Sequence, residues 1–212
     1  MGTRGALGFR IDGKDKIAYD HFDSYPSGLG AAVAKFLVKA ASTRAGLARL
    51  QAKARLLQAI PKDSKPTPED IKRCAKYTDL GVSNQSTDDW YCLLRNAQGN
   101  PAAMLQVQKY EDSASFMLDS LFCEYAYIIN LDENVLEFYV GFRHMPHDLG
   151  RYSKDMTSVN EQKAEKNETI YYPMALARTF RLNRIPKNII KMMEKAEIDV
   201  AEPERKKNLQ EA

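Results

Sequence analysis

Long hydrophobic runs are missing from this chain of 212 residues. No apolar stretch reaches the roughly 18 residues that a membrane-spanning helix requires. The first residues, up to Asp12, also lack the apolar segment of a secretory signal peptide. We therefore expect a protein that neither spans a membrane nor carries an export signal, and that resides in the cytoplasm.

Cysteine and histidine are scarce, at three residues each. Cys74, Cys92 and Cys123 are widely spaced. An odd number of cysteines without a C-x-x-C pair argues against a disulfide framework or a zinc site, so we expect buried thiols. The phosphate-binding loop, the dinucleotide-binding glycine motif and the G-x-S-x-G motif are missing as well. The sequence therefore predicts neither a cofactor nor a bound metal.

Charge of one sign does not dominate. The net charge is only +3, with 44% hydrophobic and 28% charged residues. This composition is typical of a soluble globular protein, and it excludes a polycation that binds nucleic acid with its whole surface. The length suits one domain, which we predict over residues 1–196, followed by a charged, flexible tail over residues 197–212. The oligomeric state stays open.

Alternating apolar residues predict two hairpins and one further strand. The first hairpin covers residues 4–20 and turns at Asp12-Gly13, a pair that favours a tight turn. The second covers residues 121–142, which are rich in aromatic and β-branched side chains. The last strand is predicted over residues 172–182. We expect these strands to form one largely antiparallel sheet.

Helical periodicity fills much of the rest of the chain. Apolar residues recur every three to four positions between residues 31 and 57, and Thr67-Pro68 is a favourable start for another helix. The predicted fold class is α+β, with the helices of residues 31–77 on one face of the sheet. The polar residues 153–169 are predicted to form a loop, and residues 188–196 a short helix.

The densest group of polar side chains is Asp20-His21-Phe22-Asp23-Ser24-Tyr25. A histidine beside carboxylates can act as a general base. On an extended segment His21, Asp23 and Tyr25 would share one face, because side chains alternate. In the structural alternative, Asp23 and Ser24 cap the loop and the following helix, while His21 satisfies backbone groups.

The chain start, Met1-Gly2-Thr3-Arg4-Gly5, offers a hydroxyl just before the first predicted strand. Here Thr3 resembles the nucleophile of the N-terminal nucleophile hydrolases, in which the hydroxyl attacks an acyl carbon and the freed α-amine acts as the base. This resemblance implies an amide hydrolase, with His21 and Asp23 completing the candidate catalytic set. Removal of Met1 alone would expose Gly2, which argues against the hypothesis.

A further polar segment, residues 141–151, follows the second hairpin. His144 and His147 lack the spacing of a metalloprotease helix, and the proline between them disfavours a helix. Arg143 and Arg151, together with loop amides, suit a phosphate or a carboxylate. The alternative is a packed loop with exposed basic residues.

Glu124 lies within an apolar strand, where a carboxylate is either exposed at an edge or buried beside a partner such as Arg4. A buried carboxylate is a candidate site residue. We expect the opening loop, Glu124 and residues 144–151 to converge on one cleft. The predicted ligand-binding residues are Arg4, Ser24, Tyr25, Glu124, Arg143, His144, His147 and Arg151.

Basic residues gather in the two predicted helices and the segment behind them. They are Lys35, Lys39, Arg44, Arg49, Lys53, Arg55, Lys62 and Lys65. Only Asp63 opposes them within this stretch. Such a face could contact nucleic-acid phosphates, but no zinc finger, recognition helix or aromatic stacking motif accompanies it, and solvated helices often have this composition.

Several strings of residues resemble an uncharacterised family found in bacteria and their phages, with distant relatives in fungi. The most specific strings are Gly2-Thr3-Arg4-Gly5, Gly13, Tyr19, His21, Asp23-Ser24-Tyr25-Pro26 and Gly28-Leu29-Gly30. The resemblance reaches to about Pro186. It implies one domain with a shared site and is compatible with a phage origin. Family members often carry Asn where this chain has Asp20, which weighs against a mechanism that needs a carboxylate there.

Three functions are compatible with these patterns. The first is a binding protein that holds a small anionic or nucleotide-like ligand, or a host protein, in a polar cleft. The second is the amide hydrolase with Thr3 as nucleophile. The third is a nucleic-acid-binding module that uses the basic helices.

Overall fold

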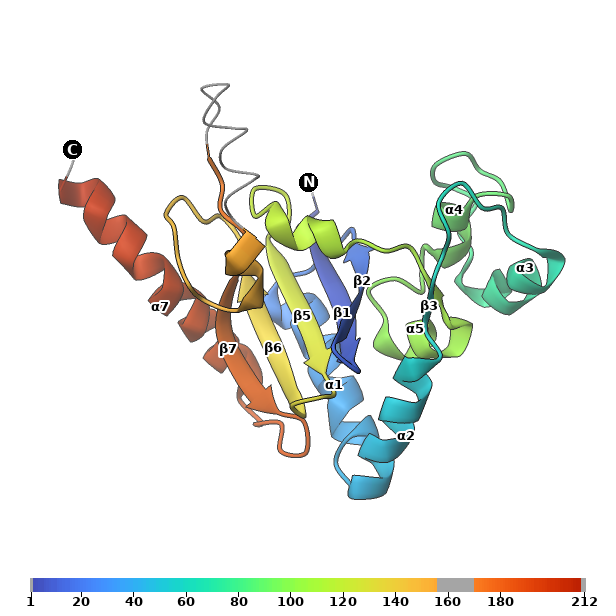
Figure 1. Cartoon of the computed structure of the whole chain (residues 1–212), viewed down its shortest axis with the longest axis horizontal. Coiled ribbons are helices and arrows are strands. Elements are labelled where there is room, and N and C mark those ends of the chain that lie inside the picture. Colours follow the sequence, from blue (N-terminus) through green and yellow to red (C-terminus); the bar gives the residue numbers. More distant parts are fainter. Residues whose placement is uncertain (1, 156–169, 211–212) are drawn as a thin grey trace.

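The computed structural model describes residues 2–155 and 170–210, with side chains up to residue 203. Its centre is a five-stranded sheet (Figure 1). In spatial order the strands are β2 (Lys14–Asp20), β1 (Gly5–Ile11), β5 (Tyr125–Asn130), β6 (Val135–Val140) and β7 (Ala175–Arg181). Neighbouring strands are antiparallel except β1 and β5, which are parallel. The predicted α+β fold with a largely antiparallel sheet is confirmed.

The turn of the first hairpin shows why Asp12-Gly13 predicts it. Both residues have positive φ, 53° and 73°, a conformation that glycine and aspartate tolerate and that two-residue hairpin turns require. Their amides donate hydrogen bonds to the carboxylate of Asp132, at 2.8 and 2.9 Å. Asp132 belongs to the turn of the second hairpin, so the two turns stabilise each other.

One face of the sheet is covered by α1 (Ala31–Ala40), α2 (Arg44–Arg55) and α7 (Ile189–Gln210). These helices bury their apolar stripes against the larger core cluster, since burial of each large side chain contributes about 1.5–3 kcal/mol. The cluster includes Leu7, Phe9, Leu37, Leu50, Tyr127, Phe138 and Met193.

The opposite face is covered by two short 3₁₀ turns, η3 (Ala114–Leu118) and η4 (Arg151–Asp155), which lie in front of the sheet in Figure 1. A second, smaller cluster is buried there. Its members include Ala6, Ile17, Met117, Ala126, Ile128, Tyr139 and Tyr152. This layer is thin, which leaves the middle of the face to polar side chains.

A small lobe beside β2 contains α3 (Pro68–Cys74), α4 (Trp90–Leu94) and α5 (Pro101–Val107). Two short parallel strands, β3 (Gln58–Ala59) and β4 (Lys109–Tyr110), join it to the rest. The prediction that all helices of residues 31–77 cover the sheet is wrong for α3. Cys74 at its end is buried with Trp90 in a third apolar cluster, so α3 packs inside the lobe.

The three cysteines are buried and free, as predicted. Helix α7 continues to Gln210, beyond the predicted short helix and into residues 197–212, which the sequence predicts to be a flexible tail. Of the predicted loop at residues 153–169, the part from residue 156 lies outside the described residues.

Candidate ligand-binding pocket at the chain start

A cavity of about 680 Å³ opens at one edge of the sheet, and we call it the N-terminal pocket. It is lined by Gly2, Thr3, Arg4, His21, Phe22, Leu121, Phe122, Glu124 and Phe142. The topology explains this grouping. Because β1 runs parallel to β5 and antiparallel to β2, the start of β1, the end of β2 and the start of β5 meet at the same edge.

Backbone hydrogen bonds fix two of the charged residues. The amide of Glu124 donates to the carbonyl of Arg4 at 3.0 Å, and the amide of Arg4 donates to Oε1 of Glu124 at 3.1 Å. The carboxylate of Glu124 is therefore engaged by a backbone group. The guanidinium of Arg4 instead lies over the ring of Phe122, with 4.7 Å between Cζ and the ring centroid.

Three phenylalanines on the wall of the pocket are unusually accessible. The exposed fractions of Phe22, Phe122 and Phe142 are 55%, 43% and 45%. A second guanidinium, that of Arg95, lies 4.8 Å from the ring centroid of Phe22. The pocket thus combines flat apolar surfaces with the cation of Arg4, and the cation of Arg95 lies beside its wall at Phe22. This arrangement suits an anion attached to an aromatic ring.

His21 lies in a positive local potential. Partial burial, followed by repulsion from Arg95 and Arg4, lowers the pKa of the imidazole below its ordinary value. Its Nδ1 shares a hydrogen bond of 2.7 Å with the hydroxyl of Tyr19. A nearby anion would oppose the repulsion, so the protonation of His21 reports on what the pocket holds.

The remaining residues of the opening loop have structural roles. Strand β2 ends at Asp20, so neither His21 nor Asp23 belongs to it. The prediction that an extended segment places both side chains on one face is therefore wrong. Asp23 adopts a positive φ of 53°, and its carbonyl accepts the amide of Leu29. The Asp23 side chain is exposed and does not line the pocket. The predicted set of Thr3, His21 and Asp23 is thus only partly brought together.

Ser24 and Tyr25 also stay outside the N-terminal pocket. Ser24 is fully buried, and its hydroxyl donates to Asp20 at 2.6 Å. Its amide donates to the carbonyl of Thr3, and its carbonyl accepts the hydroxyl of Tyr127. These bonds anchor the loop, but they are not the helix cap of the structural alternative, because no described side chain caps residues 26–30 or α1.

The segment that carries Arg143 and His147 lines a different, smaller pocket of about 100 Å³ against α7. The Arg143 side chain is buried and donates to the carbonyls of Gly141 and Val200. His147 bonds to the carbonyl of Pro173, and the ring of His144 contacts that of Tyr171 at a tilt of 52°. The expected convergence of this segment with the opening loop is therefore not found.

Arg151 lies on the second face of the sheet, where it joins a polar cluster that the sequence analysis missed. Its guanidinium donates two hydrogen bonds to Asp15, at 3.0 and 2.8 Å, and a third to Glu137. Two carboxylates on the thinly covered face explain why Arg151 turns inward here. Burial opposes the charge of Arg151, but the bonds to Asp15 hold its pKa above the ordinary value.

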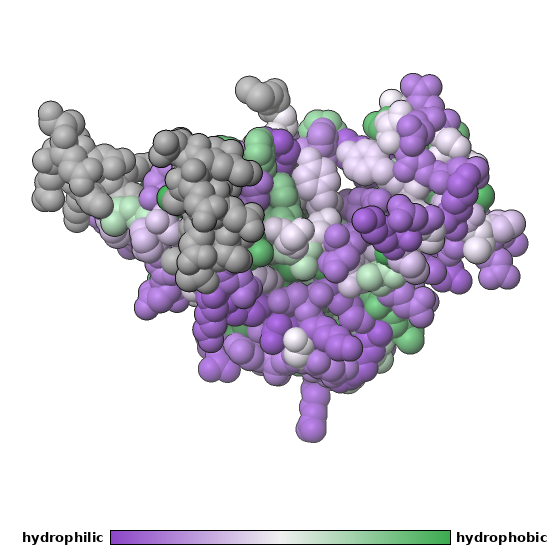
Figure 2. All heavy atoms as spheres, turned by 45° about the horizontal axis from the view of Figure 1, so that its top comes forward, coloured by the Kyte–Doolittle hydropathy of each residue, from purple (hydrophilic) through white to green (hydrophobic). Residues whose placement is uncertain are grey.

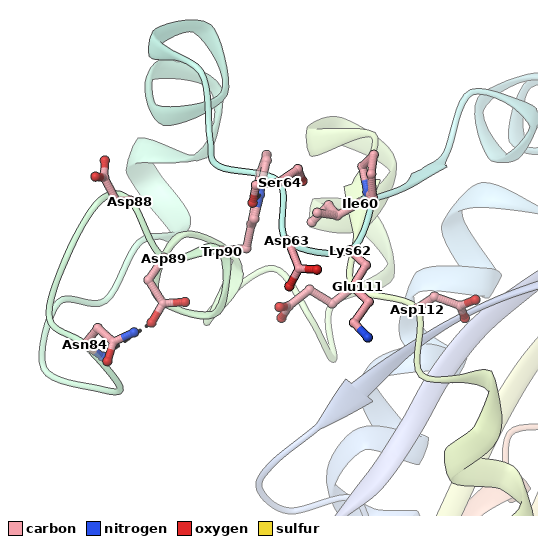
Figure 3. A pocket seen from close by; sticks show the side chains of 11 residues that line it. Ile60, Lys62, Asp63, Ser64, Asn84, Asp88, Asp89, Trp90, Glu111 and Asp112 are labelled. Atoms are coloured by element: carbon pink, nitrogen blue, oxygen red, sulfur yellow. Dashed lines mark hydrogen bonds between the residues drawn. The ribbon is translucent and has the colours of Figure 1, made fainter.

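A second unpredicted feature is a cavity of about 690 Å³ between the lobe and the sheet. Its lining includes five carboxylates, those of Asp63, Asp88, Asp89, Glu111 and Asp112. In Figure 3 the side chains of Asp63 and Glu111 point toward each other, whereas Asp88 and Asp112 point away from them. Burial, and then repulsion from Asp89, raises the pKa of Glu111. The carboxylates do not converge on one point.

Within the described ranges, no group of three or more histidine, cysteine or acidic side chains could hold a metal ion. None of the helices in that part of the chain is long and apolar enough to cross a membrane. Comparison with protein-family models, curated proteins and solved structures finds no match to this chain. The function is therefore inferred from the geometry of the pockets.

Proposed function

We propose that this protein binds a small anionic ligand with a flat aromatic group, of which a nucleotide is the simplest example, in the N-terminal pocket. The observation that carries the proposal is the guanidinium of Arg4 above the ring of Phe122, within a cavity of about 680 Å³. A ring inserted against the phenylalanines places its anionic substituent close to Arg4.

Charge and shape support a small ligand. The amide of Arg4 donates to Oε1 of Glu124, the one carboxylate among the described lining residues, whereas the guanidinium of Arg4 lies over the Phe122 ring. On the face shown in Figure 2, hydrophobic residues form small separate patches within a largely hydrophilic surface. Extended protein interfaces usually present a larger continuous apolar area, so this face suits a small ligand better than a host protein.

Replacing Arg4 with glutamine should weaken the binding of adenosine monophosphate about tenfold or more, because a charge-assisted hydrogen bond contributes about 1.5–3 kcal/mol. Isothermal titration calorimetry measures the change. Arg184→Gln, at an exposed position outside the pocket lining, is the matched control and should bind like the unaltered protein. Adenosine and inorganic phosphate should each bind more weakly than the nucleotide. Equal affinities for the Arg4→Gln variant and the control would contradict the proposal.

Binding of an anion should also raise the pKa of His21. The imidazole is held below its ordinary pKa by burial and by Arg95 and Arg4, and a bound phosphate offsets the repulsion from both guanidiniums. Protons are then taken up on binding, so affinity should increase as the pH falls through the pKa of His21 in the complex. An NMR titration of the His21 ring protons, with and without adenosine monophosphate, measures the shift. An unchanged titration curve for His21 would argue against an anion in this pocket.

The amide hydrolase is a second candidate because Thr3 and His21 line the same cavity. This mechanism requires loss of Met1 and Gly2, which would free the α-amine of Thr3 to act as the base. Intact-mass measurement of the purified protein tests it directly. Loss of both residues supports hydrolysis, and a chain that retains Gly2 excludes this mechanism.

A further inference from the structure

The two helices α1 and α2 belong to the longest stretch of the sequence without an acidic residue. From Ser24 to Lys62 there are seven lysine and arginine residues and no aspartate or glutamate. The net charge of the whole chain is only +3. Six of the seven cations lie on α1 and α2, so positive charge is concentrated on this pair of helices.

The structure brings three of these cations to one groove. A cavity of about 250 Å³ lies between α1 and α2, with Lys39 on the first helix and Arg49 and Lys53 on the second. All three side chains are exposed. The apolar part of the lining comes from Phe36, Ala40, Leu50 and Leu105. This α1–α2 groove shares no lining residue with the N-terminal pocket.

The cations of the groove are not used to stabilise the fold. Arg55, on the same helix as Arg49, pairs with Asp12 at 3.0 Å. Lys16 likewise donates to three carbonyls at the end of α2. By contrast, no salt bridge between described residues involves Lys39, Arg49 or Lys53. Their charge is available to a partner.

We infer that the α1–α2 groove binds the phosphate backbone of a nucleic acid. Cations on both sides of a groove, without a competing carboxylate, complement a row of phosphates. An anionic membrane fits less well, since an interfacial helix must insert an apolar face into the lipid. The apolar faces of α1 and α2, with Leu37 and Leu50, are already buried in the core.

The test compares the full chain with the triple variant Lys39→Gln, Arg49→Gln, Lys53→Gln. Fluorescence anisotropy with a labelled DNA duplex of about 20 base pairs gives the affinity at several salt concentrations. Three phosphate contacts contribute about 2.7 to the slope of log K against log salt. From about 50 to 200 mM NaCl, the unaltered protein should therefore lose about 40-fold more affinity than the variant.

The matched control is Arg184→Gln, Lys191→Gln, Lys195→Gln, which removes the same charges from exposed positions on and before α7. This variant should keep the slope of the unaltered protein. An equal reduction of the salt slope in both variants would show a non-specific charge effect and overturn the inference. The absence of duplex binding at low salt would overturn it as well. Tighter binding to phosphatidylserine vesicles than to the duplex, lost in the groove variant alone, would also overturn it in favour of a membrane. Thermal unfolding of both variants shows that they are folded.

Discussion

Replacement of Arg151 with methionine should lower the free energy of unfolding by about 3–5 kcal/mol, the usual effect of removing one partner from a buried ion pair. In the folded chain its guanidinium bonds to Asp15 and Glu137, whose side chains are only 15% and 5% exposed. Methionine keeps the apolar contacts but removes the cation that Asp15 and Glu137 share. Of these two carboxylates, Asp15 alone keeps an ion pair with another cation among the described residues, that of Arg10, at 3.2 Å. Urea denaturation followed by circular dichroism measures the loss.

A double variant separates the charge effect from lost packing. Glu137→Gln removes the more buried carboxylate and keeps an acceptor for the side-chain amide of Asn130, which bonds to Glu137 at 2.7 Å. In the Glu137→Gln, Arg151→Met protein the loss in free energy of unfolding should therefore differ from the sum of the two single-variant losses, by a coupling free energy of about 1–3 kcal/mol. Additive losses would mean that Arg151 acts through packing alone.

Replacement of Asp20 with asparagine should stabilise the protein at neutral pH, by about 1–3 kcal/mol. Burial raises the pKa of Asp20 to about 6, although the hydroxyl of Ser24 donates to the carboxylate and opposes this. Asparagine accepts the same hydrogen bond without a charge. The Asp20 side chain also lies close against Gly99, because a Cβ atom added at Gly99 would collide with Oδ1 of Asp20.

The sign of the pH dependence is fixed by the direction of the shift. The folded chain holds the Asp20 proton more tightly than the unfolded chain, whose ordinary pKa is 3.8. The contribution of the protonated Asp20 to the free energy of unfolding is complete below that value and is lost as the pH rises through about 6. The free energy of unfolding, measured between these limits, should fall less steeply in Asp20→Asn than in the unaltered protein. Asp148→Asn, at an exposed position, is the control and should retain the slope.

Much of the fold could be predicted from local patterns. The turn at Asp12-Gly13 requires positive φ at both positions, and the sequence supplies residues that tolerate it. Aromatic and β-branched residues located β5 and β6, because these strands are buried along nearly their whole length. The parallel pairing of β1 with β5 could not be predicted this way, since it joins segments more than a hundred residues apart and leaves no local signal.

The candidate site was only half predictable. Thr3, Arg4, His21 and Glu124 meet in the N-terminal pocket because three strand ends share one edge, and polar residues next to apolar strands indicated this. Arg151 does not join them. Asp15, on the second strand, is its main partner, and a single aspartate in an exposed-looking hairpin gives no sign that it will be covered. Ring exposure at Phe122 likewise depends on tertiary packing.

The most direct test of the N-terminal pocket is an amide chemical-shift titration of the isotope-labelled protein with adenosine monophosphate. The account predicts that the largest shifts fall at residues 2–4, 21–22, 121–124 and 142, and that Arg4→Gln reduces them at equal ligand concentration. If no resonance moves with any of the four common nucleoside monophosphates, or if the shifts fall mainly in the α1–α2 groove, the pocket is not the binding site.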